Sequence, residues 1–447
     1  MSRASSPGSA RLAAATLAMG LILALKAGPV AAGLERVSQR TEIDYWAGAD
    51  GEEGRIALSR LSLHSALRLR AGESWDIDLA GRVEAADDRT GLGTTRSYSP
   101  ASRPLIDGEH VRLEIDQFVL SRRFGANRLS IGKQTLAWGV LDGIQITDRF
   151  DPVRRRDFVL TEFRPERLAR WGLRWRHDGE GLRADLAVAF DPTVNQLAQA
   201  GDRFEPLAPR LRGGLSSDLD ASNIDIIQSD RDRYWRDATY GLRLSHAIGR
   251  ADASLLFLSG PDPEPLLRVA GIDPERPTIE LVYPRRKLIG ATLEVPAGSR
   301  VWRVELAHIP DQPINLDSAL PLASDERGRS LAGLGLDWNA PEGWFVNAQL
   351  AVDRLSGCSP KAIRPQTDVI ATLRAQRGFV QDTLKFRSEV LASLSDGDGV
   401  VRAALDWQIS DPWRLSIGAD WLFGTRAGLF GQYCDASQLW LRMRWSL

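Results

Sequence analysis

The amino-acid sequence predicts an all-β protein, a transmembrane antiparallel β-barrel of about 18 strands preceded by a signal peptide. Three observations support this fold class. An apolar segment rich in alanine and leucine opens the chain, apolar and polar residues alternate through most of the remainder, and the connections between the predicted strands are alternately tight and long. A period of two is the signature of strands. Short turns at one end and longer loops at the other are typical of membrane barrels.

The N-terminal segment indicates export. Two arginines accompany an apolar run from Leu12 to Leu25, which has about the length of a signal-peptide core. We expect residues 1–32 to be a cleaved signal peptide and residues 33–447 to form the barrel. The alternative is a membrane anchor helix, which Lys26 argues against because it interrupts the run. No later run of 18 apolar residues occurs, so a helical membrane protein is not expected.

Alternating residues define the strands. In the run that begins at Trp413, for example, Leu415 and Ile417 share one face, whereas Arg414 and Asp420 lie on the other. Sixteen strands are the alternative to eighteen, because short strands have uncertain boundaries. The predicted strands are 37–47, 55–70, 75–85, 110–124, 127–135, 168–177, 182–190, 239–248, 251–259, 286–295, 300–309, 330–339, 343–354, 366–375, 381–394, 399–409, 412–423 and 437–447.

A soluble β-sandwich would show the same alternation, so the polar face and the connections must distinguish the two folds. Full charges lie in the middle of the predicted strands, which fits a water-filled lumen inside and lipid outside. A sheet surrounded by lipid cannot leave an open edge and must close on itself. We therefore expect a barrel in the cell outer membrane, with outer-membrane lipid around it.

The C-terminal run from Leu439 to Leu447 alternates to its last position. It resembles the assembly signal of outer-membrane barrels, although it ends on leucine and has Trp445 two places earlier. The resemblance implies the barrel assembly machinery as a partner. The alternation is the same in trimeric and monomeric barrels, so the oligomeric state stays open.

Composition excludes several classes of function. The chain has 57 basic and 58 acidic residues, and residues 1–32 hold three of the basic ones, which leaves a net charge of −4 after cleavage. A nucleic-acid partner would require a basic surplus. Five histidines and two cysteines without metal-ligand spacing predict no metal site, and no cofactor is expected. An outer-membrane phospholipase would place a histidine and a serine together on an outward face near the headgroups, and none of the five histidines shows this arrangement, so an enzyme is not predicted.

One long connection, residues 136–167, carries many charges together with apolar residues that need a packing surface. We expect this segment to fold into the lumen and constrict it. The alternative is a solvated surface loop with balanced charges. Ile131-Gly132-Lys133-Gln134, Trp138-Gly139 and the later Asp151-Pro152 resemble the signature region of a poorly characterised family of porin-like Gram-negative outer-membrane barrels, with looser similarity to alginate-export-type barrels. The resemblance implies a porin-like or export channel.

We predict a channel for the diffusion or export of small solutes. An excess of arginines in the lumen would give the pore a preference for anionic or amphipathic solutes. The same arginines could instead pair with the neighbouring aspartates and only pin the segment. A sealed structural or surface-interaction barrel without conductance is the alternative function. The predicted pathway and constriction residues are Lys133, Gln134, Trp138, Asp142, Asp148, Arg149, Asp151, Arg154, Arg155, Arg156, Arg170 and Arg174.

The two cysteines, Cys358 and Cys434, lie in two predicted loops on the long-loop side. An oxidising compartment permits a disulfide between them. The loops are four strands apart, so this bridge requires both to fold over the mouth of the barrel.

Overall fold

The structure is a computed structural model. It describes residues 33–50, 56–87, 91–93, 95–158, 166–198, 202–205, 225–229, 231, 234–271, 278–316, 324–357 and 363–447. The predicted signal peptide, residues 1–32, lies outside the described residues and stays a prediction. No helix in these ranges is long and apolar enough to cross a membrane.

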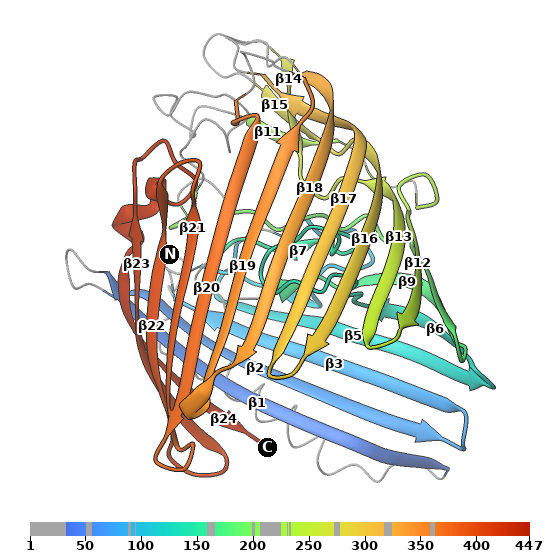
Figure 1. Cartoon of the computed structure of the whole chain (residues 1–447), viewed down its shortest axis with the longest axis horizontal. Helices are drawn as coiled ribbons and strands as arrows, with labels where there is room; N and C mark the ends of the chain where they lie inside the picture. The colour runs from blue at the N-terminus through green and yellow to red at the C-terminus, as the bar shows by residue number, and fades with distance from the viewer. Residues whose placement is uncertain are drawn as a thin grey trace, which may run out of the picture.

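Eighteen antiparallel strands form one closed barrel (Figure 1), as the alternation predicts. Each strand pairs with its neighbour in the chain, and β24 returns to pair with β1. The sheet therefore has no open edge, as a lipid environment requires. The barrel strands are β1 (Leu34–Asp50), β2 (Ile56–Ala71), β3 (Trp75–Ala86), β5 (Val111–Phe124), β6 (Asn127–Gln134), β9 (Arg170–Asp178), β10 (Leu182–Ala189), β12 (Thr239–Ile248), β13 (Ala251–Pro261), β16 (Arg285–Ala297), β17 (Arg300–Asn315), β18 (Ser324–Asn339), β19 (Trp344–Leu355), β20 (Thr367–Phe379), β21 (Leu384–Ser393), β22 (Asp398–Gln408), β23 (Trp413–Phe423) and β24 (Gln438–Ser446).

The two faces of the sheet differ as period two requires. Leucine, isoleucine, phenylalanine and tryptophan side chains are exposed on the outer face, among them Leu255, Ile417 and Trp407. Arginines and carboxylates lie on the inner face and pair across strands, as Arg402 does with Asp420. An apolar exterior around a charged interior is the pattern of a transmembrane barrel.

Tight turns join the strands at one end, for example between β5 and β6 and between β12 and β13 (Figure 1). Most connections at the opposite end are long and carry the remaining elements. These are β4 (Ile106–Asp107), β7 (Val153–Arg154), β8 (Glu166–Arg167), β11 (Asp225–Gln228), β14 (Leu266–Gly271), β15 (Thr278–Val282) and the 3-10 helix η3 (Gly431–Ala436), while η2 (Pro341–Gly343) lies in a tight turn. The sequence did not predict these elements because they are too short to show a period.

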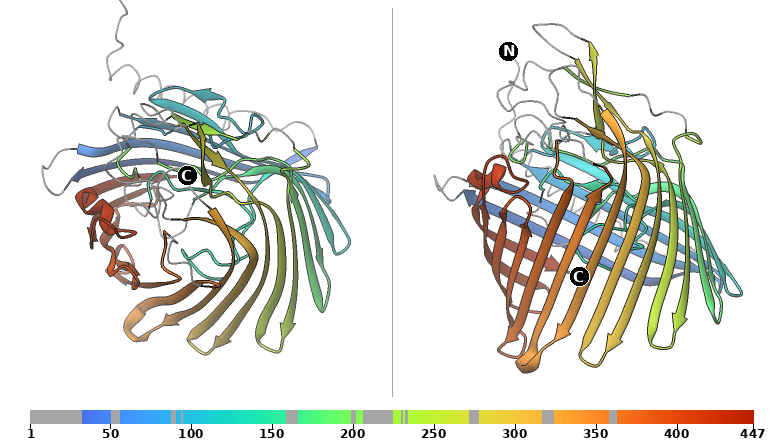
Figure 2. Two further views of the ribbon diagram at one scale, coloured as in Figure 1. Left: turned by 90° about the horizontal axis from the view of Figure 1, so that it is seen from above. Right: turned by 45° about the horizontal axis from the view of Figure 1, so that its top comes forward.

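The connection between β6 and β9 runs inside the ring of strands (Figure 2, left). Two stretches of it are described, residues 135–158 and 166–169, and the first is called the inner segment below. Its two-residue strand β7 pairs with β8 of the second stretch, and Arg154 also forms an isolated bridge with Gln196. Its position therefore depends on contacts with the barrel wall.

Candidate functional site

Apolar side chains of the inner segment pack on an apolar part of the inner wall. Leu136, Trp138, Ile146 and Phe150 are all buried in this cluster. Burial of such side chains removes apolar area from water and fixes the segment to one side of the lumen. The wall residues of the cluster, called the apolar seat here, are Ala187 and Ala189 of β10, Leu256 and Leu258 of β13, Leu288 of β16, Ala307 and Ile309 of β17, Leu331 of β18 and Ala351 of β19.

Two glycines bring the wall backbone close to the segment. A Cβ atom at Gly241 of β12 would lie 2.6 Å from two ring carbons of Trp138. A Cβ atom at Gly335 of β18 would lie 2.6 Å from a methyl carbon of Leu141. Both distances are shorter than van der Waals contact allows, so the seat is closely fitted to this segment.

A buried carboxylate, Glu305 of β17, holds the segment beside the seat. Its Oε1 accepts hydrogen bonds from the backbone N–H groups of Val140 (2.5 Å) and Leu141 (2.7 Å). Its Oε2 accepts bonds from the N–H of Thr147 (2.9 Å) and from the Thr147 hydroxyl (2.6 Å). The side chain has no exposed area. A buried carboxylate needs such donors, so Glu305 is a positioning residue for the segment.

Trp138 and Asp148 stabilise the fold of the segment itself. Trp138 donates its ring N–H to Asp185 Oδ2 of β10 at 3.0 Å and its backbone N–H to Asp148 Oδ1 at 3.2 Å. Asp148 also forms an ion pair with Arg167 of β8. Trp138 thus links the turn at Asp148, through its backbone, to the barrel wall, through its indole.

Asp151 and Arg170 form a second buried link. The Nε atom of Arg170 lies 3.6 Å from Asp151 Oδ1. Arg170 donates to the carbonyl oxygen of Phe150 and to the hydroxyl of Thr239 (2.9 Å). Asp151 accepts a hydrogen bond from the backbone N–H of Leu136. Burial raises the pKa of the Asp151 carboxyl to about 7, although Arg170 and the Leu136 N–H oppose this rise.

On the opposite wall, Arg154 lies among carboxylates. It donates to Glu84 of β3 at 3.2 Å and to Glu114 of β5 at 2.8 Å. It also donates to the hydroxyl of Tyr98 at 3.2 Å. The Arg154 side chain is 3% exposed. Its charge is therefore committed to holding the segment to β3 and β5.

Arg156 and Asp157 continue this attachment toward β2. Asp157 accepts two hydrogen bonds from Arg60 of β2, at 2.7 and 3.0 Å, and pairs with Arg156 at 3.1 Å. Phe158 then packs between loops, with ring centroids 4.8 Å from Tyr433 and 5.6 Å from Phe430. The inner segment is thus fixed at both ends and crosses the lumen between them.

Arg155 differs from its two neighbours, because its side chain is 41% exposed. It pairs with Glu264 at 3.1 Å and donates to Gln145 at 3.2 Å. Arg149 is partly buried, and burial together with the guanidinium groups of Arg329 and Arg286 lowers its pKa. These two bases lie near the mouth of the long loops.

Four residues that the sequence predicted for the pathway and constriction, Lys133, Gln134, Asp142 and Arg174, make none of the contacts between the inner segment and the wall described above. Gln134 is buried and donates to the carbonyl of Gly172 at 3.4 Å, and Arg174 pairs with Asp185 on the wall. Asp142 lies half-buried in the turn at the tip of the segment. The structure does not bring Lys133 to this group. It lies on the other face of β6 from Gln134, and its ammonium donates to the carbonyl of Ser102 at 3.4 Å.

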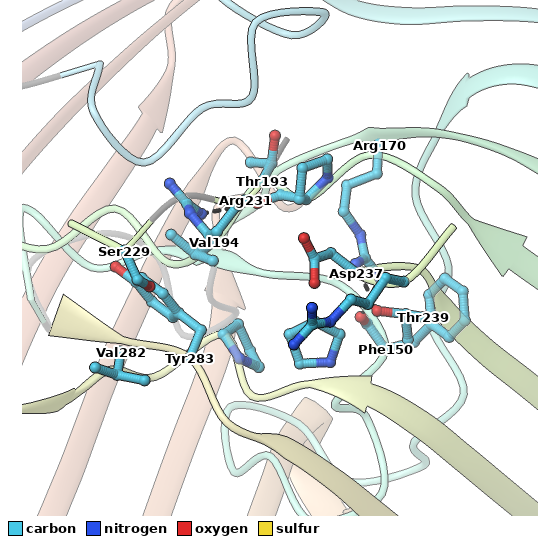
Figure 3. A pocket seen from close by; sticks show the side chains of 14 residues that line it. Phe150, Arg170, Thr193, Val194, Ser229, Arg231, Asp237, Thr239, Val282 and Tyr283 are labelled. Atoms are coloured by element: carbon cyan, nitrogen blue, oxygen red, sulfur yellow. Dashed lines mark hydrogen bonds between the residues drawn. The ribbon is translucent and has the colours of Figure 1, made fainter. Parts of the chain in front are cut away.

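A cavity of about 330 Å³ lies on the long-loop side of the inner segment. Figure 3 shows Phe150 and Arg170 on one side of it, Ser229 and Tyr283 on another, and Asp237 between them. Arg231 stacks on Tyr283 with 4.7 Å from guanidinium carbon to ring centroid. The remaining lining residues are Pro192, Thr193, Val194, Arg236, Thr239, Pro261, Pro263 and Val282. Three arginines against one carboxylate give this lining a positive surplus.

The sequence did not point to Glu305 or Gly241. Each lies in an ordinary alternating strand, and each acquires its role only through contact with a distant segment. One signal was available: Leu256, Leu288 and Leu331 place apolar side chains on faces where a lumen calls for polar ones.

Among the described residues, no group of three or more histidine, cysteine or acidic side chains is placed to hold a metal ion. Cys358 lies outside the described residues, so its predicted disulfide with Cys434 stays a prediction. Cys434 lies in η3, with its sulfur 2.8 Å from the carbonyl oxygen of Gly431.

Comparison with known proteins gives a likeness in structure only. No family model and no curated protein sequence matches the chain. The solved structure of OccAB1 from Acinetobacter baumannii matches with a TM-score of 0.52 and 10% identity, covering 92% of this chain and 95% of that one. OccAB3 from the same organism (TM-score 0.49, 9% identity, 92% and 98% covered) and Pseudomonas aeruginosa OccK2 in complex with glucuronate (0.49, 10%, 92% and 96%) also match. The chain therefore has the β-barrel fold seen in OccAB1.

Proposed function

We propose that the protein is an outer-membrane channel for the diffusion or export of small solutes, with a preference for anionic or amphipathic ones. The observation that carries this proposal is a lumen whose charged side chains stay open to solvent beside the inner segment. Inward-facing Arg442 pairs with buried Asp44 at 2.7 Å, and Arg303 pairs with Glu294 at 2.9 Å, while Arg442, Arg303 and Glu294 remain partly exposed. Partly exposed charges inside a barrel require water, which supports a continuous aqueous path.

The preference for anions rests on the base of the inner segment that stays exposed and on the lining of the cavity. Arg155 is exposed near the outer mouth, and the cavity above Phe150 adds a positive surplus to proline, valine and aromatic surfaces. Such a lining suits a solute with one negative group and an apolar body. Charged side chains near a constriction set the preference of a pore.

Planar-bilayer recordings test the proposal. We expect discrete conductance steps, and a reversal potential under a KCl gradient that indicates anion preference. Arg155→Ala should reduce this preference, because it removes the accessible base of the segment. Arg426→Ala is the matched control, since Arg426 is an exposed arginine of the loop between β23 and β24 that also pairs with one carboxylate. Clear cation selectivity that Arg155→Ala leaves unchanged would contradict the proposal.

A sealed structural or surface-interaction barrel is the second candidate. The attachment of the inner segment to β17 on one side and to β2, β3 and β5 on the other favours it. In this case the purified barrel would insert into bilayers without conductance steps, whereas the channel would conduct.

A further inference from the structure

Three arginines lie side by side at the short-turn end of the lumen. Arg123 of β5 is directly opposite Arg128 of β6, and Arg128 is directly opposite Arg176 of β9. Arg176 is in turn opposite Asp185, whose carboxylate binds Trp138 inside the barrel, so the arginines share the inner face. We call Arg123, Arg128 and Arg176 the arginine row. Like charges directly opposite each other destabilise a sheet, so this arrangement calls for a compensating anion.

The carboxylate nearest to the row does not balance it. Asp76 Oδ2 lies 3.1 Å from Arg128 and 3.5 Å from Arg123, and Asp76 Oδ1 accepts a hydrogen bond from Arg70 at 3.2 Å. One buried carboxylate therefore serves three guanidinium groups. The guanidinium groups are partly exposed, which leaves donors facing the lumen.

The other neighbouring carboxylates are committed elsewhere. Asp185 binds Arg174 through both oxygens, at 2.9 and 2.5 Å, and also accepts the Trp138 ring N–H. Arg176 approaches Asp178, at 3.5 Å, through a largely solvent-exposed pair. Within the described chain, the buried Nε atom of Arg123 reaches no hydrogen-bond acceptor, and the buried Nε atom of Arg176, which is the atom that approaches Asp178, makes no hydrogen bond there. Buried donors without acceptors are rare in folded proteins.

We infer that the arginine row binds a small oxyanion with two or more negative charges, such as phosphate or a dicarboxylate, at the short-turn mouth of the lumen. Guanidinium groups present paired donors that match phosphate and carboxylate oxygens. The inference deepens the proposed function and rests on it for the role of the site. Short turns mark the periplasmic end of a bacterial barrel, so an anion in transit would meet the row at that end.

Calorimetric titration of the full-length barrel in detergent tests the site without requiring conductance. We expect saturable binding of inorganic phosphate and of succinate, each at least tenfold tighter than acetate, at low ionic strength where exposed charges are little screened. Arg128→Gln should weaken phosphate binding about tenfold, because one charge-assisted contact is lost. Arg387→Gln is the matched control: Arg387 of β21 is 29% exposed against 27% for Arg128, and it donates two hydrogen bonds to Asp406, one to each carboxylate oxygen.

A second variant separates anion binding from a purely structural role. Asp76→Asn removes the shared carboxylate and should tighten phosphate binding several-fold, whereas loss of a structural ion pair alone would leave the affinity unchanged. Equal binding of phosphate and acetate by the wild-type barrel, or equal loss in Arg128→Gln and Arg387→Gln, overturns the site. A barrel that binds phosphate but never conducts refutes the channel and leaves the site standing. A conducting barrel without phosphate binding refutes the site alone.

Discussion

Thr147 and Glu305, 158 residues apart in the chain, are joined by two hydrogen bonds to the same carboxylate oxygen, one from the Thr147 N–H and one from its hydroxyl. Val140 and Leu141 donate to the other oxygen. A single side chain of the wall thus holds three residues of the inner segment. This contact determines where the segment lies in the lumen.

Replacing Glu305 should therefore free the inner segment without unfolding the barrel. Glu305→Ala leaves four donors without this acceptor, two of them buried at Thr147 and two part-buried at Val140 and Leu141, which costs roughly 3 kcal/mol in segment docking. We expect larger and noisier single-channel currents and faster cleavage of the segment by added protease. Glu294→Gln is the control, because Glu294 also faces the lumen but is partly exposed and pairs with Arg303. Quiet currents of wild-type size in Glu305→Ala would show that other contacts suffice.

Filling the seat should have a similar effect by steric means. Gly241→Val places carbon atoms where the Trp138 ring lies, so the ring must leave and lose its bond to Asp185. Overpacking of this kind typically costs about 1–3 kcal/mol. Hydrogen exchange of the Trp138 ring N–H, followed by NMR, should become at least tenfold faster. Gly81→Ala is the comparison, because a Cβ there meets only an ordinary contact at 3.4 Å. Unchanged exchange in Gly241→Val would argue that the wall yields instead.

Asp151 should make docking of the segment depend on pH. Burial raises the pKa of Asp151 to about 7 from an ordinary value of 3.8. Between these values the folded chain binds a proton that the unfolded chain lacks, so this contribution to stability is present at low pH and falls as the pH rises to about 7. The free energy of unfolding in urea should fall from pH 4 to pH 8 by on the order of 2–4 kcal/mol more in the wild type than in Asp151→Asn. Parallel pH profiles would exclude a raised pKa.

Phe158 should hold the far end of the segment. Phe158→Ala removes the ring that contacts Phe430, Tyr433 and Phe204. Because Phe158 is partly buried, we expect a cost below the roughly 3–5 kcal/mol typical of a core phenylalanine. We expect protease to cut near residue 158 in this variant. Tyr433→Phe keeps the aromatic contact and should resist cleavage as the wild type does. If protease cuts both variants equally, the ion pair between Arg60 and Asp157, and not the Phe158 ring, holds this end of the segment.

The sequence predicted the barrel well because the residues of each strand alternate between a lipid-facing side and a lumen-facing side. Trp413 and Arg414, adjacent in β23, face lipid and lumen because the period is two. The eighteen predicted ranges match the eighteen barrel strands, with most boundaries shifted by a few residues, as in 381 against Leu384. The prediction missed longer extensions at the end of β17 (309 against Asn315) and at the start of β18 (330 against Ser324). Boundaries move because hydrogen-bonded pairing, and not side-chain pattern, decides where a strand ends.

The site could be predicted only in part. The pattern around Trp138 and Asp151 marked an unusual connection, but nothing local told Arg154 from Arg155. Burial separates them: Arg154 meets carboxylates of β3 and β5, whereas Arg155 faces a loop. Lys133 appeared to belong with Gln134 by adjacency, yet adjacent strand residues face opposite sides, and the loop at Ser102 covers Lys133.

The bond between Thr147 and Glu305 also constrains the order of assembly. The inner segment leaves the wall after β6, but its anchor is in β17, which follows it by more than a hundred residues. Contacts so distant in sequence form late, because a long loop must close first. The segment therefore cannot reach its final place until most of the wall has been laid down. A partly assembled barrel that ends at β13 lacks Glu305, so the inner segment would not yet be held across its lumen as it is in the complete barrel.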